Sequence, residues 1–433
     1  MKLYEQYKHS GIDWLGQVPS HWKISRLGKI LKPFSEKNHA DLPLLSITRE
    51  QGVIERDREN QDENHNFIPD DLSGYKLLKK GQFGMNKMKA WQGSYGVSPF
   101  TGIVSPAYFI FDFVQEINPD FFHWAIRSKL YISFFGSASD GVRIGQWDLS
   151  KSRMKEIPFI LPSLPEQLAI AKFLDEKTTQ IQTAIGIKNE QIAKLKEYRQ
   201  ALINQNVTKG LNANTPMKNS GVEWLGEVPE HWEVSKLGRI LKPFSEKNHA
   251  DLPLLSITRE QGVIERDREN QDENHNFIPD DLSGYKLLKK GQFGMNKMKA
   301  WQGSYGVSPF TGIVSPAYFI FDFVQEINPN FFHWAIRSKL YISFFGSASD
   351  GVRIGQWDLS KSRMKNIPFA IPPLPEQLAI AEFLDEKTAQ IDTAIAQYQC
   401  QIERLKEYQQ SLVSEVVTGK MRVSNLENNI GVN

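Results

Sequence analysis

Side chains suited to binding nucleic acid are concentrated between Tyr75 and Gly96, a stretch that reads YKLLKKGQFGMNKMKAWQGSYG and returns from Tyr285. It holds five lysines and no acidic residue. Ammonium groups pair with phosphates, short amide and hydroxyl groups bind base edges, and glycines let the backbone approach closely. We therefore predict DNA contacts from Lys76, Lys79, Lys80, Asn86, Lys87, Lys89, Trp91, Gln92, Ser94 and Tyr95, and from their copies Lys286, Lys289, Lys290, Asn296, Lys297, Lys299, Trp301, Gln302, Ser304 and Tyr305. For any single lysine the alternative is that Met85–Ala90 forms a strand with one solvated face.

A second candidate is the glycine-punctuated segment SDGVRIGQW, which begins at Ser139 and returns at Ser349. Its arginine and glutamine have the geometry to bind guanine and adenine edges, respectively. We predict base contacts from Arg143, Gln146, Arg353 and Gln356. Arg143 could equally pair with Asp140.

A third candidate is the segment KPFSEKNH, which begins at Lys32 and is followed by a Thr-Arg pair near position 48. We predict phosphate or base contacts from Lys37, Arg49, Lys247 and Arg259. Surface salt bridges with Glu36 and Glu50 are an alternative at least as strong. The acidic run that begins at Glu55 predicts a solvated loop, because acidic side chains repel phosphate.

An enzymatic site is not evident in the sequence. The tetrapeptide NPDF at Asn118, copied as NPNF at Asn328, is similar to the NPPF motif of adenine methyltransferases, but its second proline is missing and no glycine-rich cofactor loop follows a strand. We interpret it as a helix-entry turn capped by asparagine. Pro69–Asp71 lacks the downstream acid-x-Lys of a nuclease, no Walker loop occurs, and the nine histidines show no metal-ligand spacing. We predict no catalytic residue and no metal, and a structural role for His21 beside Trp22.

Composition narrows the class of protein. The 433 residues include 52 Lys+Arg and 50 Asp+Glu, so a histone-like basic protein is excluded and any DNA binding must rest on local clusters. The single cysteine, Cys400, excludes a disulfide framework and a thiolate zinc finger. No signal peptide and no run of 18 apolar residues is present, so we expect a cytoplasmic protein with no membrane segment.

The chain is one unit written twice, with a shift of 210 positions. Ile30–Lys155 and Ile240–Lys365 are identical except that Asp120 is replaced by Asn330. Such identity indicates a recent duplication or conversion. Short β-rich runs, Gly, Pro and Asn turns and a helical stretch near Phe121–Tyr131 predict an α+β globular domain in each copy.

A long amphipathic helix follows each globular domain. Prolines end the preceding structure, and Pro165 suits a first helical turn. Apolar residues then recur at sums of three and four, which predicts an a/d seam. Its members are Leu174, Ile181, Ile185, Ile192, Leu195 and Leu202 in the first helix and Leu384, Ile391, Ile395, Ile402, Leu405 and Leu412 in the second.

We predict that the two helices pair within the chain as an antiparallel coiled coil with approximate twofold symmetry, because two seams most economically bury each other. Packing of each helix on its own domain is the alternative. The expected boundaries are residues 1–161 and 212–371 for the globular domains, 162–211 and 372–420 for the helical spacers, and 421–433 for a disordered tail.

On these motifs the chain resembles the specificity subunits of type I restriction-modification systems. The resemblance rests on SGIDWLGQVPSHW opening each unit, on IPFILPSLPEQLAIAKFLD leading into each helix, on KEYRQALI near its end, and on the two-copy layout. It implies two target-recognition domains that each read half of a bipartite duplex DNA site, and helices that dock two modification subunits. It also implies that S-adenosylmethionine and ATP belong to the modification and restriction subunits, so we expect no cofactor in this chain.

One departure from the family pattern is informative, because the two recognition domains in this family generally differ. Here they are nearly identical, and two identical readers related by a twofold axis require the same half-site on opposite strands. We therefore predict an interrupted palindrome as the target. The alternatives are a self-contained methyltransferase or nuclease, which predicts that Asn118 variants lose activity with binding intact, and a free-standing DNA-binding regulator, which predicts tight binding by the chain alone.

Overall fold

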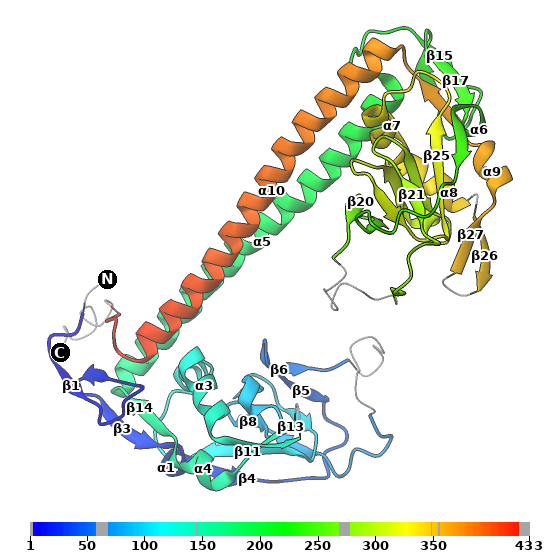
Figure 1. Ribbon diagram of the computed structural model, residues 1–433. Helices are drawn as coiled ribbons and strands as arrows, with labels where there is room; N and C mark the ends of the chain where they lie inside the picture. The colour runs from blue at the N-terminus through cyan, green and yellow to red at the C-terminus, as the bar shows by residue number, and fades with distance from the viewer. Residues whose placement is uncertain are drawn as a thin grey trace. The chain divides into compact units, whose positions relative to one another are not determined.

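The protein divides into two compact units, each combining a globular domain with part of both long helices. The computed structural model describes residues 3–57, 68–143, 146–267, 278–347, 349–353 and 356–423. The units are Met1–Lys188 with Cys400–Asn433, and Asn189–Gln399 (Figure 1). Most of the predicted acidic loop and of the predicted tail lies outside the described residues.

The first unit is built on an antiparallel four-stranded sheet in the order β4-β11-β8-β9. Register is fixed at both ends of β8, where Phe83 lies opposite Phe111 and Val97, and Asn86 opposite Tyr108. Two-stranded ladders surround this sheet. The strands are β1 (Tyr7–His9), β2 (Gln17–Pro19), β3 (Lys23–Arg26), β4 (Leu31–Phe34), β5 (Leu45–Thr48), β6 (Gly52–Glu55), β7 (Lys76–Leu78), β8 (Phe83–Asn86), β9 (Tyr95–Val97), β10 (Gly102–Val104), β11 (Tyr108–Phe113), β12 (Ser139–Arg143), β13 (Gln146–Leu149) and β14 (Pro158–Leu161).

Short helices cover one side of the domain and complete an aromatic core. Tyr95 packs on Phe135 with ring centroids 4.5 Å apart, and Phe122 packs on Phe159 at 4.8 Å. The predicted helical stretch is two helices, because the backbone leaves the helix between Ile126 and Lys129. The helices are α1 (Leu27–Ile30), η1 (Ala90–Gln92), α2 (Pro119–Ile126), α3 (Lys129–Ser137), α4 (Lys151–Glu156) and α5 (Leu164–Lys209).

The second unit repeats this architecture, as the duplicated sequence requires. Its four-stranded sheet has the order β18-β25-β22-β23. The strands are β15 (Met217–Asn219), β16 (Glu227–Pro229), β17 (Glu233–Lys236), β18 (Leu241–Phe244), β19 (Leu255–Thr258), β20 (Gly262–Glu265), β21 (Lys286–Leu288), β22 (Phe293–Asn296), β23 (Tyr305–Val307), β24 (Gly312–Val314), β25 (Tyr318–Phe323), β26 (Ser349–Arg353), β27 (Gln356–Leu359) and β28 (Pro368–Ile371). The helices are α6 (Leu237–Ile240), η2 (Ala300–Gln302), α7 (Pro329–Ile336), α8 (Lys339–Ser347), α9 (Lys361–Lys365) and α10 (Leu374–Val417).

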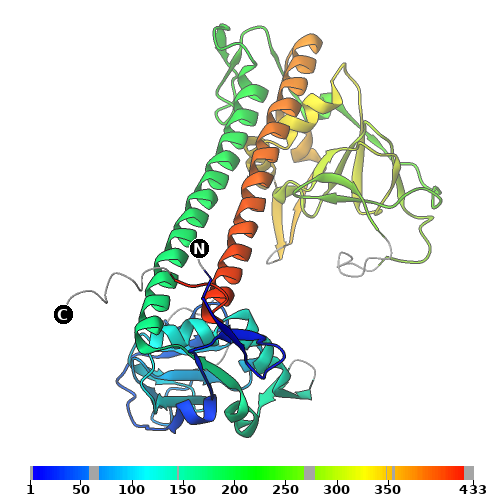
Figure 2. The ribbon, with the colours of Figure 1, turned by 90° about the vertical axis from the view of Figure 1, so that its left-hand side faces the viewer.

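The long helices α5 and α10 lie side by side and run in opposite directions (Figures 1 and 2). In the first unit Gln182 donates to Gln409 at 2.8 Å, and in the second Arg199 pairs with Asp392 at 3.2 Å, so residue numbers rise on one helix as they fall on the other. Most of the predicted seam is buried, which confirms the antiparallel pair. Leu195, Leu202 and Leu405 are half-buried.

A buried carboxylate fastens the start of α5 to the N-terminal motif. Glu166 is 5% exposed and accepts bonds from His21 Nε2 at 2.9 Å and from Trp22 Nε1 at 3.2 Å. Its other oxygen accepts from the backbone and side chain of Ser163 at 3.2 and 2.8 Å, and the backbone bond is the glutamate half of a capping box. Burial acts to raise the pKa of Glu166, but the bonds from His21, Ser163 and Trp22 lower it below its ordinary value. The predicted structural role of His21 is thereby explained.

The second copy of this joint has fewer bonds. Glu376 accepts from His231 at 2.8 Å and from Trp232 at 3.0 Å. Pro373 stands where Ser163 does and has no N–H to donate.

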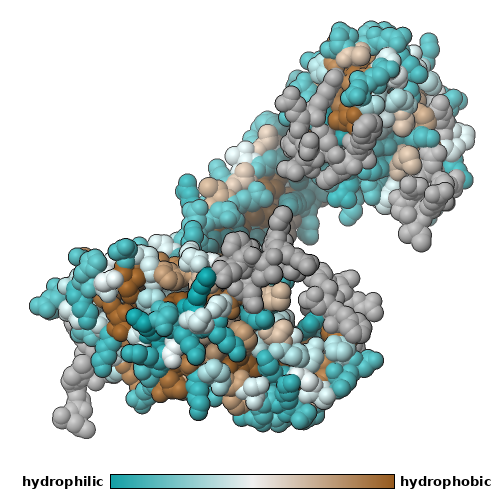
Figure 3. Space-filling view, turned by 60° about the horizontal axis from the view of Figure 1, so that its bottom comes forward, coloured by the Kyte–Doolittle hydropathy of each residue, from teal (hydrophilic) through white to brown (hydrophobic). Residues whose placement is uncertain are grey.

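Among the described residues no helix is long and apolar enough to cross a membrane. Figure 3 shows hydrophilic side chains over much of the face in view, with smaller hydrophobic patches between them.

We expect Glu166→Gln to lower the free energy of unfolding by about 1.5–3 kcal/mol, because it weakens charge-assisted bonds to a buried group. Glu376→Gln should cost less, since that carboxylate accepts two fewer bonds. Because the folded pKa of Glu166 is depressed, its contribution is present above the unfolded pKa of roughly 4.3 and is lost as pH falls through the folded value. Urea denaturation of both variants at pH 7 and below pH 4 measures this, and equal costs for the two variants would contradict it.

Candidate nucleic-acid interface

Basic side chains gather at one end of the four-stranded sheet of the first unit. Lys87 and Lys151 place their ammonium groups 5.9 and 4.5 Å from the centroid of the Phe109 ring. Lys76 Nζ donates to the carbonyl of Tyr108 at 2.7 Å. The pKa of Lys76 is lowered by burial and by the charges of Lys151, Lys37 and Lys87, so these lysines are close enough to repel one another. We call this group, Lys37, Lys76, Lys87, Lys151, Tyr108 and Phe109, the basic surface.

Buried, hydrogen-bonded side chains support the basic surface. The Tyr108 hydroxyl is hydrogen-bonded to the side chains of Asn86 and Ser46, and burial raises its pKa. Asn86 itself is 9% exposed and its Oδ1 accepts from the backbone of Met88 at 3.2 Å. Crowded positive charge on such a fixed scaffold is the arrangement that holds a polyanion.

The second unit repeats the basic surface in its described residues. Lys286 Nζ donates to the carbonyl of Tyr318 at 2.8 Å, and Lys297 lies 5.9 Å from the centroid of the Phe319 ring. Tyr318 is bonded to Ser256 and Asn296 in the same way.

Two of the predicted DNA segments meet. The hairpin β26–β27 is joined to the lysine-rich segment by a backbone bond of 3.4 Å from Leu359 to the carbonyl of Lys297. Within the hairpins Arg143 lies opposite Gln146, and Arg353 opposite Gln356. The side chains of these four residues lie outside the described part of the structure, so their predicted base contacts stay predictions.

Burial corrects part of the prediction for the lysine-rich segment. Ser94 is 2% exposed and Tyr95 is fully buried, and Ser304 and Tyr305 are the same in the second copy, so these four side chains form core and not an accessible contact. Asn86 and Asn296 are buried supports for Tyr108 and Tyr318 rather than exposed groups.

The long strand proposed as the alternative for this segment is also wrong, because β8 ends at Asn86 and a 3₁₀ turn follows from Ala90. Lys89 and Lys299 are exposed beside this turn. Trp91, Gln92, Trp301 and Gln302 are half-buried within it.

Several other residues predicted to contact DNA form ion pairs with nearby carboxylates. Lys79 pairs with Glu36 at 3.2 Å and lies over Phe34, as Lys289 does with Glu246 and Phe244. Arg49 pairs with Glu50 at 2.9 Å, and Arg259 with Glu260 at 2.8 Å, which supports the salt-bridge alternative for these arginines. Glu36 forms its ion pairs with Lys79 and His39 and not with Lys37. Lys37 belongs instead to the basic surface. Lys247, the copy of Lys37, is exposed.

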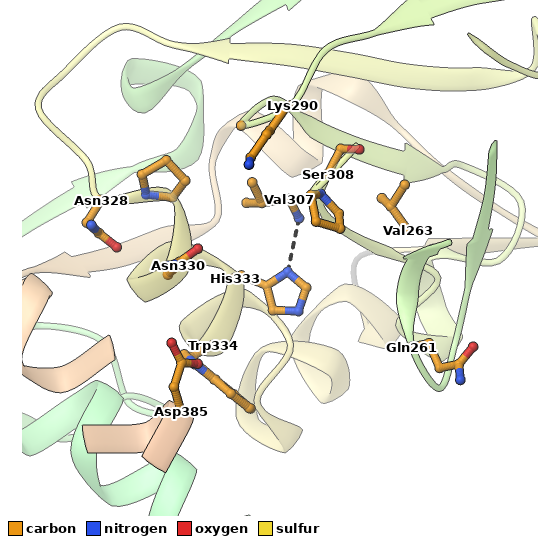
Figure 4. A pocket seen from close by; sticks show the side chains of 13 residues that line it. Gln261, Val263, Lys290, Val307, Ser308, Asn328, Asn330, His333, Trp334 and Asp385 are labelled. Atoms are coloured by element: carbon orange, nitrogen blue, oxygen red, sulfur yellow. Dashed lines mark hydrogen bonds between the residues drawn. The ribbon is translucent and has the colours of Figure 1, made fainter. Parts of the chain in front are cut away.

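Lys80 and Lys290 line a cavity at the opposite end of the sheet from the basic surface. The cavity measures about 550 Å³ in the first unit and about 590 Å³ in the second (Figure 4). His123, which lines it, accepts at Nδ1 from the backbone of Val97 at 3.2 Å, and burial lowers its pKa to about 4. The imidazole is therefore neutral at pH 7 with its proton on Nε2. Asp120 and Asn330, the one difference between the duplicated segments, both line this cavity.

Sequence reasoning missed Lys151 and Phe109. Lys151 lies more than fifty positions from the lysine-rich segment, and only the folding of α4 against β11 brings it to Phe109. Counting charges along a short stretch of sequence does not reveal such a contact. The interpretation of Asn118 is confirmed, because its Oδ1 accepts from the backbone of Phe121 at 2.7 Å as the cap of α2.

Comparisons with known proteins identify the family of both recognition domains. Residues 103–196 and 301–404 each match the family model described as the type I restriction modification DNA specificity domain. The chain belongs to the specificity subunits of type I restriction-modification systems.

Relatives of this specificity subunit extend over nearly its whole length. The type I restriction enzyme MjaVIII specificity subunit of Methanocaldococcus jannaschii is 25% identical over 98% of this chain and 99% of its own. The EcoDI specificity subunit of Escherichia coli is 24% identical over 94% of this chain and 90% of its own. A solved chain from work on complex assembly and conformational transition of the type I R-M system has the same fold, with a TM-score of 0.66 and 13% identity over 93% of this chain and 99% of that one.

We expect alanine at Lys87 and Lys151, with the same change at Lys297 and Lys361, to weaken binding of random-sequence duplex DNA. The slope of log affinity against log salt should fall by about one for each phosphate contact removed. The matched control is alanine at Lys80 and Lys290, which lie at the other end of the sheet. A control variant that loses as much slope would show that the basic surface is not the DNA face. Fluorescence anisotropy at several salt concentrations measures both.

Proposed function

We propose that this specificity subunit reads a bipartite, gapped DNA site, with one recognition domain on each half, and that it carries no catalytic centre of its own. The observation that carries the proposal is that both copies match the DNA specificity domain and that the lysine contacts described in the first copy at Tyr108 and Phe109 recur in the second at Tyr318 and Phe319. Adenine methylation with S-adenosylmethionine and ATP-dependent cleavage are assigned to separate modification and restriction subunits. We propose that the helix pair of α5 and α10 docks two modification subunits.

The proposed target is an interrupted palindrome. The duplicated segments differ only at position 120, and that residue lines the cavity beyond the far end of β8 rather than the basic surface. The side chains available to touch bases are therefore the same in both domains. Within each unit the two helices run antiparallel, and each recognition domain leads into the start of a different helix. These directions support the expectation that the two readers face the duplex in opposite orientations.

A methyltransferase within this chain is not favoured. Asn118, the residue that such a site would need, has its side-chain oxygen bound to Phe121 and its backbone N–H bound to Gln167 at 2.9 Å. The first bond caps α2 and the second joins it to α5, so both groups have structural tasks.

We expect a gapped palindrome, methylated at adenine on both strands, when this chain is expressed with its modification subunit. Single-molecule sequencing of host DNA measures this, and expression of the modification subunit alone is the control. Two unrelated half-sites would contradict the twin-reader proposal. Methylation that persists without this chain would remove the specificity role.

A further inference from the structure

A tryptophan joins the recognition domain to both long helices in the second unit. Trp334 of α7 donates from Nε1 to Asp385 Oδ1 of α10 at 2.8 Å (Figure 4). The guanidinium of Arg199, on α5, lies 5.6 Å from the centroid of the Trp334 ring. Arg199 Nε in turn pairs with Asp392 Oδ1 of α10 at 3.2 Å. Arg199 thus contacts the recognition domain and the partner helix at once.

The first unit has different side chains at the same positions. Trp124 keeps its bond to the helix, from Nε1 to Asp175 Oδ1 at 2.7 Å. Counting back 210 positions, Gln409 stands where Arg199 does and Gln182 stands where Asp392 does. The two amides bind each other at 2.8 Å, so the helices remain joined. Between Gln409 and Trp124 lies a cavity of about 430 Å³, which both residues line.

The two arrangements differ in strength for a physical reason. A guanidinium over an indole is attracted by the ring electrons and also packs on its face, and its charge attracts a nearby carboxylate. A neutral amide pair has neither attraction. The surrounding charges are alike except at one position. Arg127 and Lys129 beside Trp124 are repeated as Arg337 and Lys339 beside Trp334, whereas Asp120, which together with burial raises the pKa of Asp175, is replaced by the neutral Asn330.

We infer that Arg199 is a positioning residue, which holds the second recognition domain to the helix pair more firmly than the first domain is held. The two copies then present the same basic surface on unequally fixed supports. Only the consequence for DNA rests on the proposed function: the two halves of a symmetric site are read by domains of different stiffness. The fastening itself is tested without DNA.

Hydrogen exchange with mass spectrometry on the full-length chain tests this inference. Most peptides of the two domains are identical, but those that contain Asp120 or Asn330 can be told apart, and the same peptides contain Trp124 or Trp334. We expect the amides of α7 to exchange about three- to tenfold more slowly than those of α2. Arg199→Gln should remove the difference, and Arg199→Lys should restore part of it.

The matched variant places the same arginine and aspartate in the first unit. Gln409→Arg together with Gln182→Asp should slow the Asp120 peptide and leave the Asn330 peptide unchanged. A merely structural effect on stability would instead shift both peptides together.

A further variant exchanges the two residues that distinguish the peptides, Asp120 and Asn330, and so controls for the difference between the peptides themselves. In the double variant Asp120→Asn/Asn330→Asp, the slower exchange should stay with α7. Equal exchange of the two peptides in the unaltered chain, or slower exchange that follows the aspartate or asparagine label, would overturn the inference.

Discussion

The constraint on which the first unit depends is the buried carboxylate of Glu166, and its more exposed copy Glu376 serves the second unit with fewer bonds. Glu166 lies in the first turn of α5 and draws together Trp22, His21 and Ser163, which come from two regions 140 positions apart in the chain. A carboxylate this deeply buried is stable only when its oxygens are bonded, so the N-terminal motif and the helix start must meet. The neighbouring Gln167 extends the joint by accepting from the backbone of Asn118 at the cap of α2. The direction in which the long helix leaves the domain is fixed by these two residues.

The same joint also involves the chain just beyond the end of each long helix. Gly419, just beyond α10, has φ of 74° and lies so close to Pro19 and Trp22 that a Cβ would clash. Gly210 has φ of 75° and meets Glu376 and Trp232 in the second unit. The end of one helix therefore packs against the joint at the start of the other. Each globular domain is completed by chain that belongs, in sequence, to the other copy.

The repeat, the helix pair and the capped turn at Asn118 could all be predicted from the sequence, because each depends on spacing along the chain. The apolar residues of the seam recur at a helical period, and burial of Ile192 and Ile402 follows from that period, whereas Leu384 packs in the core of the second globular domain. The basic surface was predicted only in part. Ser94 and Tyr95 follow the lysines closely in sequence, yet both are buried, because β8 and β9 lie inside the domain with every residue buried. Lys151 reaches Phe109 only through tertiary contacts. Local composition identifies a charged segment, but it does not show which faces of that segment meet solvent.

Duplication fixes some properties of the molecule and leaves others open. Identity across the recognition domains makes their side chains alike, and this identity is the basis on which we propose a symmetric target. The helices have diverged, so the position taken by Arg199 and Asp392 in one unit is taken by Gln409 and Gln182 in the other. A change of side chain there alters how a domain is held without altering any group that faces DNA. Under the proposed function, sequence preference is set by the recognition domains and the firmness with which each domain is held is set by the helices, so either can change while the other is kept.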